Sequence, residues 1–239
     1  MTRPAFYALE SGGWRDYITL LHPPYTAWHL SYVAIGAALA PHFEGRRLLA
    51  ALAAFFLAMG IGAHALDEVT DRPLQTRIAD RVLVALAAVS VSAAAAIGIA
   101  ASLAWTLWLL PFVAAGAFLV VAYNLELFGG LFHTYLWFGF AWGAFPLLSA
   151  YLVMAEKLTL ESLLAALFAL LTSLVQRTLS TPVRNVRRRV AEVTGTVTLT
   201  DGTHEEITAQ TLMGAPETAL RLLAAAMVSL AAALLVLRF

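Results

Sequence analysis

The chain has no cysteine and few charged residues. Only 13% of its 239 residues are charged, about half the share that is usual in soluble domains. The absence of cysteine excludes disulfides, thiolate metal sites and a cysteine nucleophile. Its 15 basic and 15 acidic residues cancel, so the chain has no general basic character and we expect no nucleic-acid partner.

Apolar residues make up 61% of the sequence, and the mean hydropathy is +0.78. This composition leaves too little polar surface for a water-soluble protein and predicts an integral membrane protein. Seven apolar runs are each about long enough to cross a hydrocarbon core of about 30 Å. We therefore expect an all-α, polytopic transmembrane bundle of about seven spans, forming one domain over 1–239. The predicted spans are 25–42, 47–66, 82–103, 105–123, 132–154, 160–176 and 217–237.

The basic residues predict the orientation of this bundle. With the N-terminus in the cytoplasm and the C-terminus outside, eleven of the 15 lysines and arginines fall in cytoplasmic segments. Short cytoplasmic loops of membrane proteins carry such an excess. The same orientation places the loop that follows the second span on the cytoplasmic side.

One polar segment, 178–216, interrupts the apolar pattern and is expected to lie in the cytoplasm. Its first part is rich in arginine and is consistent with a helix on the membrane surface. Its second part alternates β-branched residues around Asp201-Gly202, a strong signal for a β-hairpin. Because an isolated hairpin is marginally stable in water, we expect it to pack on the arginine segment or on the bundle.

Ionisable residues gather where the second span ends. His64, Asp67, Glu68 and Asp71 have the spacing of one helix face. Carboxylates so close together repel unless a cation lies between them, and Mg²⁺ commonly binds one or two carboxylates together with substrate phosphates. We predict Asp67, Asp71 and Glu68 as catalytic residues, with His64 as a further metal ligand. The simpler alternative is a solvated helix end paired to nearby arginines.

Arginines and a second polar group accompany this cluster. Arg72 and Arg77 follow Asp71 and are suited to binding phosphate oxygens. Asn124 is a candidate contact to substrate, and Glu126 and His133 are candidate ligands of the same metal, or else loop residues. Either a phosphate clamp or an anchor to lipid headgroups would explain the basic residues after the sixth span, which include Arg184, Arg187 and Arg188.

These features together resemble the UbiA superfamily of intramembrane prenyltransferases, over roughly residues 15–155. The opening helix at 20–40, the segment Asp67-Glu-Val-Thr-Asp71-Arg-Pro and the Gly- and Pro-containing span at 139–151 are similar to elements of that family. The resemblance implies transfer of a prenyl group from a polyprenyl diphosphate to an acceptor, with Mg²⁺ drawing off the diphosphate.

The chain also departs from that family. Ala63-His64 stands where Asn-Asp is usual, arginines replace the second aspartate motif, and seven spans replace nine. Two other functions therefore stay open. The histidines and carboxylates suit a zinc or iron enzyme acting on a lipid, and the missing motif suits a non-catalytic protein that binds isoprenoid lipid.

Overall fold

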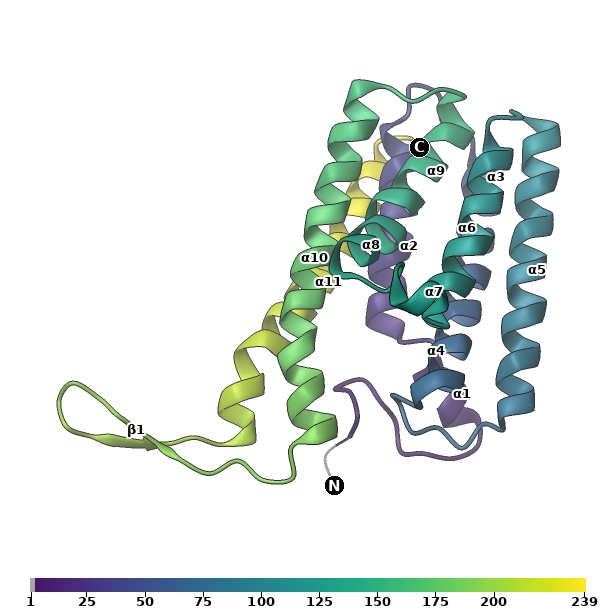
Figure 1. The fold of residues 1–239 in the computed structure, drawn as a ribbon. Helices are drawn as coiled ribbons and strands as arrows, with labels where there is room; N and C mark the ends of the chain where they lie inside the picture. The colour runs from purple at the N-terminus through teal and green to yellow at the C-terminus, as the bar shows by residue number, and fades with distance from the viewer. Residues whose placement is uncertain (1–2) are drawn as a thin grey trace.

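The computed structural model describes residues 3–239 and shows a helical bundle with a β-hairpin that projects from one end (Figure 1). Five helices are long and apolar enough to cross a membrane, which identifies the chain as an integral membrane protein. They span Gly45–Asp71, Asp80–Ala104 (α5), Tyr135–Ala155, Leu160–Arg189 (α10) and Ala209–Val236 (α11).

Two of these five helices are composite, because each contains a stretch of π-helix. The first consists of α3 (Gly45–Phe55), η1 (Phe56–Ala63) and α4 (His64–Asp71), and the second of α8 (Tyr135–Gly139), η2 (Phe140–Ala144) and α9 (Phe145–Ala155). The π-helix is rare in proteins, and where it does occur it is often found at a functional site. Both composite helices contribute to the cavity described below.

The remaining helices are shorter. The helix α2 (Pro23–Leu39) has 17 residues and α6 (Leu109–Asn124) has 16, while α1 (Trp14–Leu20) and α7 (Leu127–Gly130) are short pieces at one end of the bundle. All seven apolar runs thus form helices, and the predicted division between the third and fourth is confirmed, although the fourth helix begins at Leu109 and not at 105. Five meet the length of a span, and the total of seven crossings stays a prediction.

The helix α10 extends thirteen residues beyond the predicted end of the sixth span at 176, through Pro182 to Arg189. The basic segment after 176 is thus helical and continuous with the sixth span, and its place in the cytoplasm stays a prediction. Pro182 cannot donate to the helix ladder, but the arginines of the last turn face the negative end of the helix dipole and favour continuation. The helix α11 likewise begins early, at Ala209, behind a capping box formed by Thr208 and Thr211.

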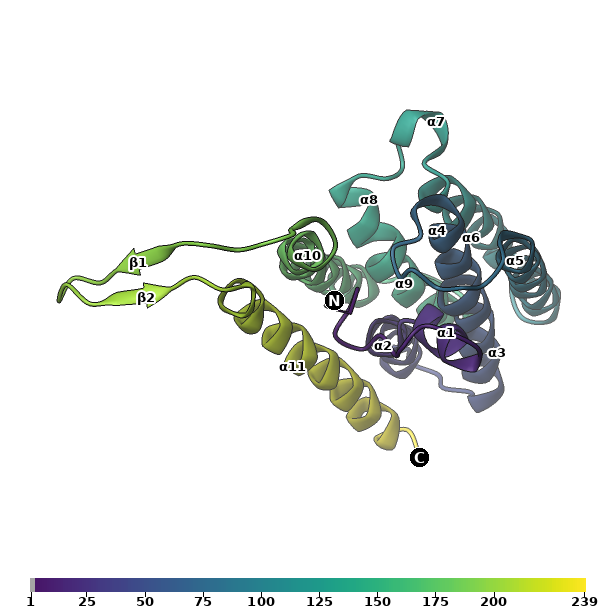
Figure 2. The same ribbon diagram turned by 90° about the horizontal axis from the view of Figure 1, so that it is seen from below.

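The predicted hairpin is confirmed, and its predicted packing is wrong. Strand β1 (Thr196–Thr198) pairs antiparallel with β2 (His204–Glu206), and residues 200–202 form the turn with Gly202 at a φ of 86°. Every strand residue is exposed, and the hairpin extends away from the helices in both views (Figures 1 and 2). Val197 is the only apolar residue of the two strands, so the hairpin has no apolar face to bury.

The helix α2 is central although it is short. Trp28, Tyr32 and Val33 are fully buried, and α2 packs against both α9 and α11. Gly36 allows this approach, because a Cβ at that position would lie 2.2 Å from the carbonyl oxygen of Leu147 in α9. The helix therefore joins two parts of the bundle through a contact that only glycine permits.

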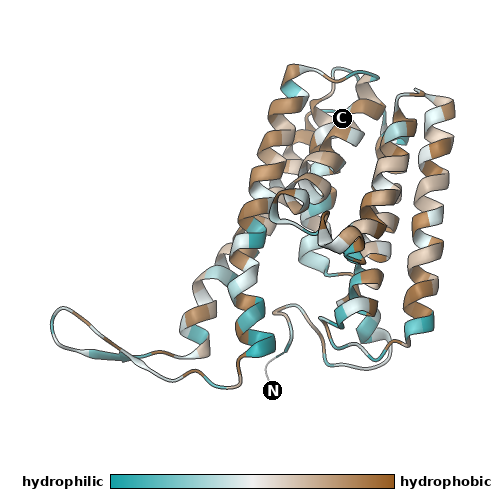
Figure 3. Ribbon diagram, viewed as in Figure 1, coloured by the Kyte–Doolittle hydropathy of each residue, from teal (hydrophilic) through white to brown (hydrophobic). Residues whose placement is uncertain are grey.

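Hydrophilic residues concentrate at the end of the bundle that carries α1, α4, the lower part of α10 and the hairpin, whereas apolar residues cover the helices above it (Figure 3). The C-terminus lies at the opposite end (Figure 1). The apolar surface above the hydrophilic end is what a hydrocarbon core requires of the helices that cross it. Which end faces the cytoplasm stays a prediction from the arginines.

Candidate functional site

A polar cavity of about 620 Å³ opens inside the hydrophilic end of the bundle. Segments far apart in the sequence line it: residues 4–7, the start of α2, α4 with the loop after it, residues 123–133, and the last turns of α10. The cavity brings together most of the polar residues that the sequence indicated, as well as several that it did not.

The carboxylates of Asp67 and Asp71 form an acidic wall. They lie one turn apart on α4, and both line the cavity. Within residues 3–239, neither carboxylate makes a hydrogen bond or an ion pair to another side chain. Two uncommitted carboxylates facing one space can bind a hydrated Mg²⁺, which keeps several waters and accepts substrate oxygens.

The lower turns of α10 form a basic wall across from α4. Arg184, Arg188 and Arg189 line the cavity. Arg177 lines it as well and donates hydrogen bonds to the Tyr123 hydroxyl at 3.0 Å and to the carbonyl of Thr134 at 2.8 Å. The cavity thus holds a pole of carboxylates and a pole of guanidinium groups.

Glu68 does not line the cavity. Its side chain is fully buried, and its carboxylate accepts the backbone N–H groups of Leu74 at 2.9 Å and Thr76 at 2.8 Å. Successive residues of an α-helix point about 100° apart, so Asp67 and Glu68 face different neighbours although they share a broad helix face. Glu68 therefore shapes the loop after α4.

The arginines of that loop also differ from expectation. Arg72 lines the cavity, but its guanidinium donates to the carbonyls of Thr76 and Ile78 and pairs with Asp80. Arg77 is exposed and lies outside the cavity lining, with its backbone N–H bonded to Asp16. In this conformation the Arg72 guanidinium therefore stabilises the loop, and the Arg77 side chain faces solvent.

Arg187 points away from the cavity, toward α11. Its guanidinium contacts the Glu217 carboxylate at 2.5 Å, and both side chains are nearly buried. It also donates to the carbonyl of Arg3. Arg187 therefore holds α10 to α11, whereas its neighbours Arg184 and Arg188 face the cavity.

Four histidines line the cavity: His22, His29, His64 and His133. The Nδ1 atoms of His29, His64 and His133 lie 2.8, 3.1 and 2.9 Å from backbone carbonyls. A carbonyl can only accept, so in each of these three rings Nδ1 carries a proton.

His22 is held differently. Its Nδ1 contacts the Tyr7 hydroxyl at 2.7 Å, and its ring stacks on His64 with centroids 4.1 Å apart. Burial, followed by the influence of His64 and Arg188, keeps the pKa of His22 well below its ordinary value. Burial likewise raises the pKa of Tyr7. Both groups are therefore neutral at pH 7.

Asn124, Glu126 and His133 share the cavity with Asp67. Asn124 is buried and donates to the carbonyl of Val120, while Glu126 lies 3.7 Å from His133. Among residues 3–239, however, no three His, Asp or Glu side chains form a group that could hold a metal ion. A fully protein-made metal cage is not present in this conformation, so a cation here would depend on water and ligand oxygens.

An apolar hollow of about 130 Å³ lies next to the polar cavity, among α3, η1, α5, α6 and α9. Alanine, glycine, valine and phenylalanine residues make up most of its wall. Tyr123 and Trp142 line both spaces. A molecule with a charged head and an apolar tail could therefore occupy the two spaces together.

Sequence reasoning missed Tyr7 as part of the cavity, and it assigned no separate role to Gln176 and Arg177, which open the basic segment after the sixth span. An ionisable residue within a membrane helix commonly marks a functional site, so Arg177, which lies inside α10, carried a signal. The N-terminal Tyr7 carried none. No family model, no curated protein and no solved structure matches this chain.

Proposed function

We propose that the chain is a UbiA-like intramembrane transferase that binds a polyprenyl diphosphate and moves its prenyl group to an acceptor. The observation that carries the proposal is that the free Asp67 and Asp71 carboxylates line the same cavity as Arg184 and Arg188. Carboxylates suit a cation, and arginines suit phosphate oxygens.

Mg²⁺ bound by Asp67 and Asp71 would neutralise the diphosphate and make it a better leaving group. Arg184 and Arg188 would bind the remaining phosphate oxygens, in place of the second aspartate motif and its metal. Charge that develops on the diphosphate as the bond breaks would thus meet fixed positive groups. The apolar hollow beyond Tyr123 and Trp142 would hold the start of the prenyl tail.

The first test measures thermal stabilisation of the purified protein in nanodiscs by farnesyl diphosphate, with and without Mg²⁺. We expect saturable, Mg²⁺-dependent stabilisation of the wild type. Asp67→Asn should remove the Mg²⁺ dependence, and Arg184→Gln should weaken binding about tenfold, the equivalent of about 1.4 kcal/mol. Arg77→Gln is the matched control, because Arg77 is exposed outside the cavity.

Equal binding by all four proteins would contradict the proposed site. Transfer itself is tested by incubating labelled farnesyl diphosphate with the protein and a membrane lipid extract. The expected result is a labelled lipid product together with released pyrophosphate. Binding without any product would favour the non-catalytic isoprenoid-binding alternative.

A zinc or iron enzyme is the second candidate, favoured by the histidines. Metal-binding histidines commonly donate the second ring N–H to a carbonyl, as His29, His64 and His133 do. Metal analysis of the purified protein separates the two candidates. About one equivalent of zinc or iron that is lost in His64→Ala would favour this one, and a requirement for added Mg²⁺ would favour prenyl transfer.

A further inference from the structure

One wall of the polar cavity consists of chain that belongs to no helix or strand. Residues 3–9, called the N-terminal segment below, have no regular secondary structure, and four consecutive residues of it, 4–7, line the cavity. In both ribbon views the segment crosses the hydrophilic end of the bundle, between the end of α10 and α1 (Figures 1 and 2). The segment therefore covers the cavity on the side that faces away from the apolar helices.

Arginine side chains of α10 and α11 hold the outer part of this segment. Arg188 donates to the carbonyl of Pro4 at 3.4 Å, and Arg187 donates to the carbonyl of the residue before it at 3.2 Å. The Arg221 guanidinium lies over the Phe6 ring, 4.7 Å from its centroid. These contacts join the segment to the two helices that form the basic side of the cavity.

The inner part of the segment packs on the opposite side of the cavity. Ala5 and Ala8 are buried and pack with Leu74 of the loop after α4, and the Tyr7 hydroxyl contacts His22 at 2.7 Å. The segment thus spans the cavity from α10 to α4 and is fixed largely by side-chain contacts. Chain held in this way opens at a lower free energy than a helical bundle does.

Arg188 belongs to both the segment's contacts and the cavity. Its Nε donates to the Pro4 carbonyl, and the residue lines the cavity. A guanidinium has five N–H donors in a fixed plane, so an anion can bind it while Nε still contacts Pro4. An anion bound there would fix the orientation of the guanidinium and thereby strengthen its contact with the segment.

We infer that the N-terminal segment is a lid over the polar cavity. It opens locally while the bundle stays folded, and an anion held at Arg188 keeps it closed. This inference goes beyond the proposed function, because the lid responds to any anion that the basic wall binds. Closure would shield the bound anion from water and so strengthen its interactions with the charged groups of the cavity.

The first arm of the test uses the absence of native cysteine and needs no ligand. Ala8→Cys introduces a thiol on the buried side of the lid, where Ala8 is 1% exposed. Ser11→Cys is the matched control, because Ser11 lies three residues further on and is exposed. A water-soluble methanethiosulfonate should modify Ala8→Cys much more slowly than Ser11→Cys in nanodiscs. Equal rates in the folded protein would overturn the lid.

The second arm asks whether position 8 is exposed by local opening. Arg221→Met removes the cation–π contact with Phe6 and should speed the modification of Ala8→Cys about two- to fivefold. Arg81→Met removes an exposed arginine of α5 and should leave the rate unchanged. Equal rates in these two variants would overturn the lid.

Arg47→Met separates local opening from unfolding of the whole bundle. Arg47 contacts Glu156, and this contact lies at the end of the bundle opposite the cavity. Its removal should leave the modification rate of Ala8→Cys unchanged even where it lowers the stability of the bundle. A rate that rises in proportion to the loss of stability would show that position 8 is exposed only by global unfolding, which would overturn the lid.

Hydrogen exchange repeats this test without a new side chain at position 8. The N–H groups of Ala8 and Leu9 are bonded to the Ala5 carbonyl and to the Thr19 hydroxyl, so they exchange when the lid opens. Mass spectrometry of the wild type should show them exchanging before the amides of α2, and faster still in Arg221→Met. Exchange of these amides only together with those of α2 would overturn the lid.

Inorganic pyrophosphate with Mg²⁺ tests closure by an anion. It should slow the modification of Ala8→Cys and leave that of Ser11→Cys unchanged. Pyrophosphate that raises the melting temperature of the wild type without slowing Ala8→Cys would overturn closure by the anion. A lack of any pyrophosphate binding would overturn the proposed diphosphate site and this closure together, whereas the rates measured without ligand decide the lid by themselves.

Discussion

Asp67 and Glu68 are neighbours in the sequence, yet their carboxylates have different surroundings. Asp67 faces the cavity without a hydrogen-bond partner among the described residues, whereas Glu68 accepts two backbone N–H groups of the loop after α4. A buried carboxylate with two such bonds is a structural group, because its bonds satisfy backbone donors that would otherwise be buried alone. Only the free carboxylate is available to a cation.

The residue-scale prediction follows from this difference. Glu68→Gln should lower the free energy of unfolding by about 3 kcal/mol, since an amide cannot accept both N–H groups as a carboxylate does and bonds to charged groups are worth about 1.5–3 kcal/mol each. Chemical unfolding in micelles measures the change. Glu161→Gln, at an exposed position at the start of α10, should be neutral. A stable Glu68→Gln protein that had lost Mg²⁺ binding would instead restore Glu68 as a metal ligand.

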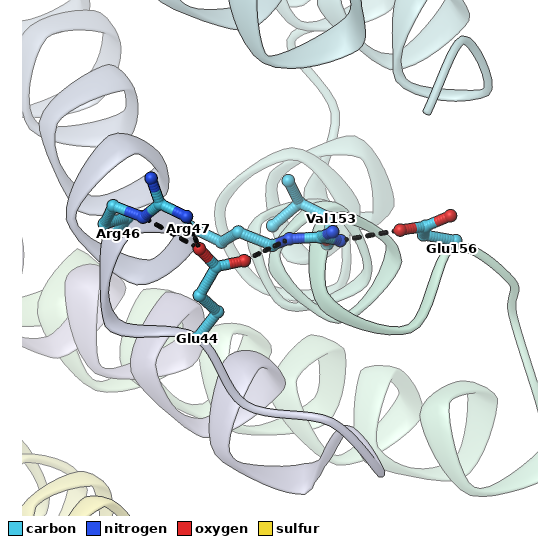
Figure 4. A network of polar contacts seen from close by, with 5 residues as sticks. All are labelled: Glu44, Arg46, Arg47, Val153 and Glu156. Carbon is cyan, nitrogen blue, oxygen red and sulfur yellow. Dashed lines mark hydrogen bonds and ion pairs between the residues drawn. The ribbon is translucent and has the colours of Figure 1, made fainter. Parts of the chain in front are cut away.

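At the scale of elements, the end of the bundle opposite the cavity is closed by one charged network (Figure 4). Arg47 of α3 donates to the carbonyl of Val153 at 2.6 Å and contacts Glu44 and Glu156 at 2.9 Å each. Arg46 contacts only Glu44, and its side chain is 86% exposed. The network therefore joins α3 to the end of α9 mainly through Arg47, and both helices also line the apolar hollow.

Arg47→Met and Arg46→Met remove the same charge from adjacent positions. We expect Arg47→Met to lower the free energy of unfolding by about 1–3 kcal/mol, because a backbone carbonyl and two carboxylates lose a partner. Arg46→Met should change it by less than about 0.5 kcal/mol, as exposed substitutions usually do. Unfolding in micelles distinguishes them. Equal effects would mean that net charge, rather than the contact between α3 and α9, determines the change.

The helices could be predicted because apolar runs are long and end at clear signals. Pro73 after α4 and Trp105 after α5 mark ends that the structure confirms. The sequence could not show where α10 ends, because the helix continues through Pro182, nor could it show the π-helical turns, which have no local signature. The sequence did indicate which carboxylates and arginines lie near the cavity. Which of them face inward depends on packing between helices, as the opposite directions of Arg187 and Arg188 show.

For the whole molecule, the hydrophilic end with the cavity and the hairpin lies opposite the C-terminus and the turn at residue 42 (Figures 1 and 3). The excess of arginine at the cavity end predicts that it faces the cytoplasm. The diphosphate head of the proposed substrate is charged and would enter the cavity from the aqueous side, so the orientation would also decide which compartment supplies it.

The absence of cysteine makes this orientation directly testable. His42→Cys and Thr200→Cys each introduce a single thiol at an exposed position, at opposite ends of the bundle. In intact cells, a membrane-impermeant maleimide should label His42→Cys, and it should label Thr200→Cys only after lysis, because the hairpin then lies in the cytoplasm. The cysteine-free parent controls for other labelling. The reverse pattern would place the cavity outside and leave cytoplasmic diphosphates without access to it. Labelling of both thiols in intact cells would contradict the arrangement of the helices across the membrane.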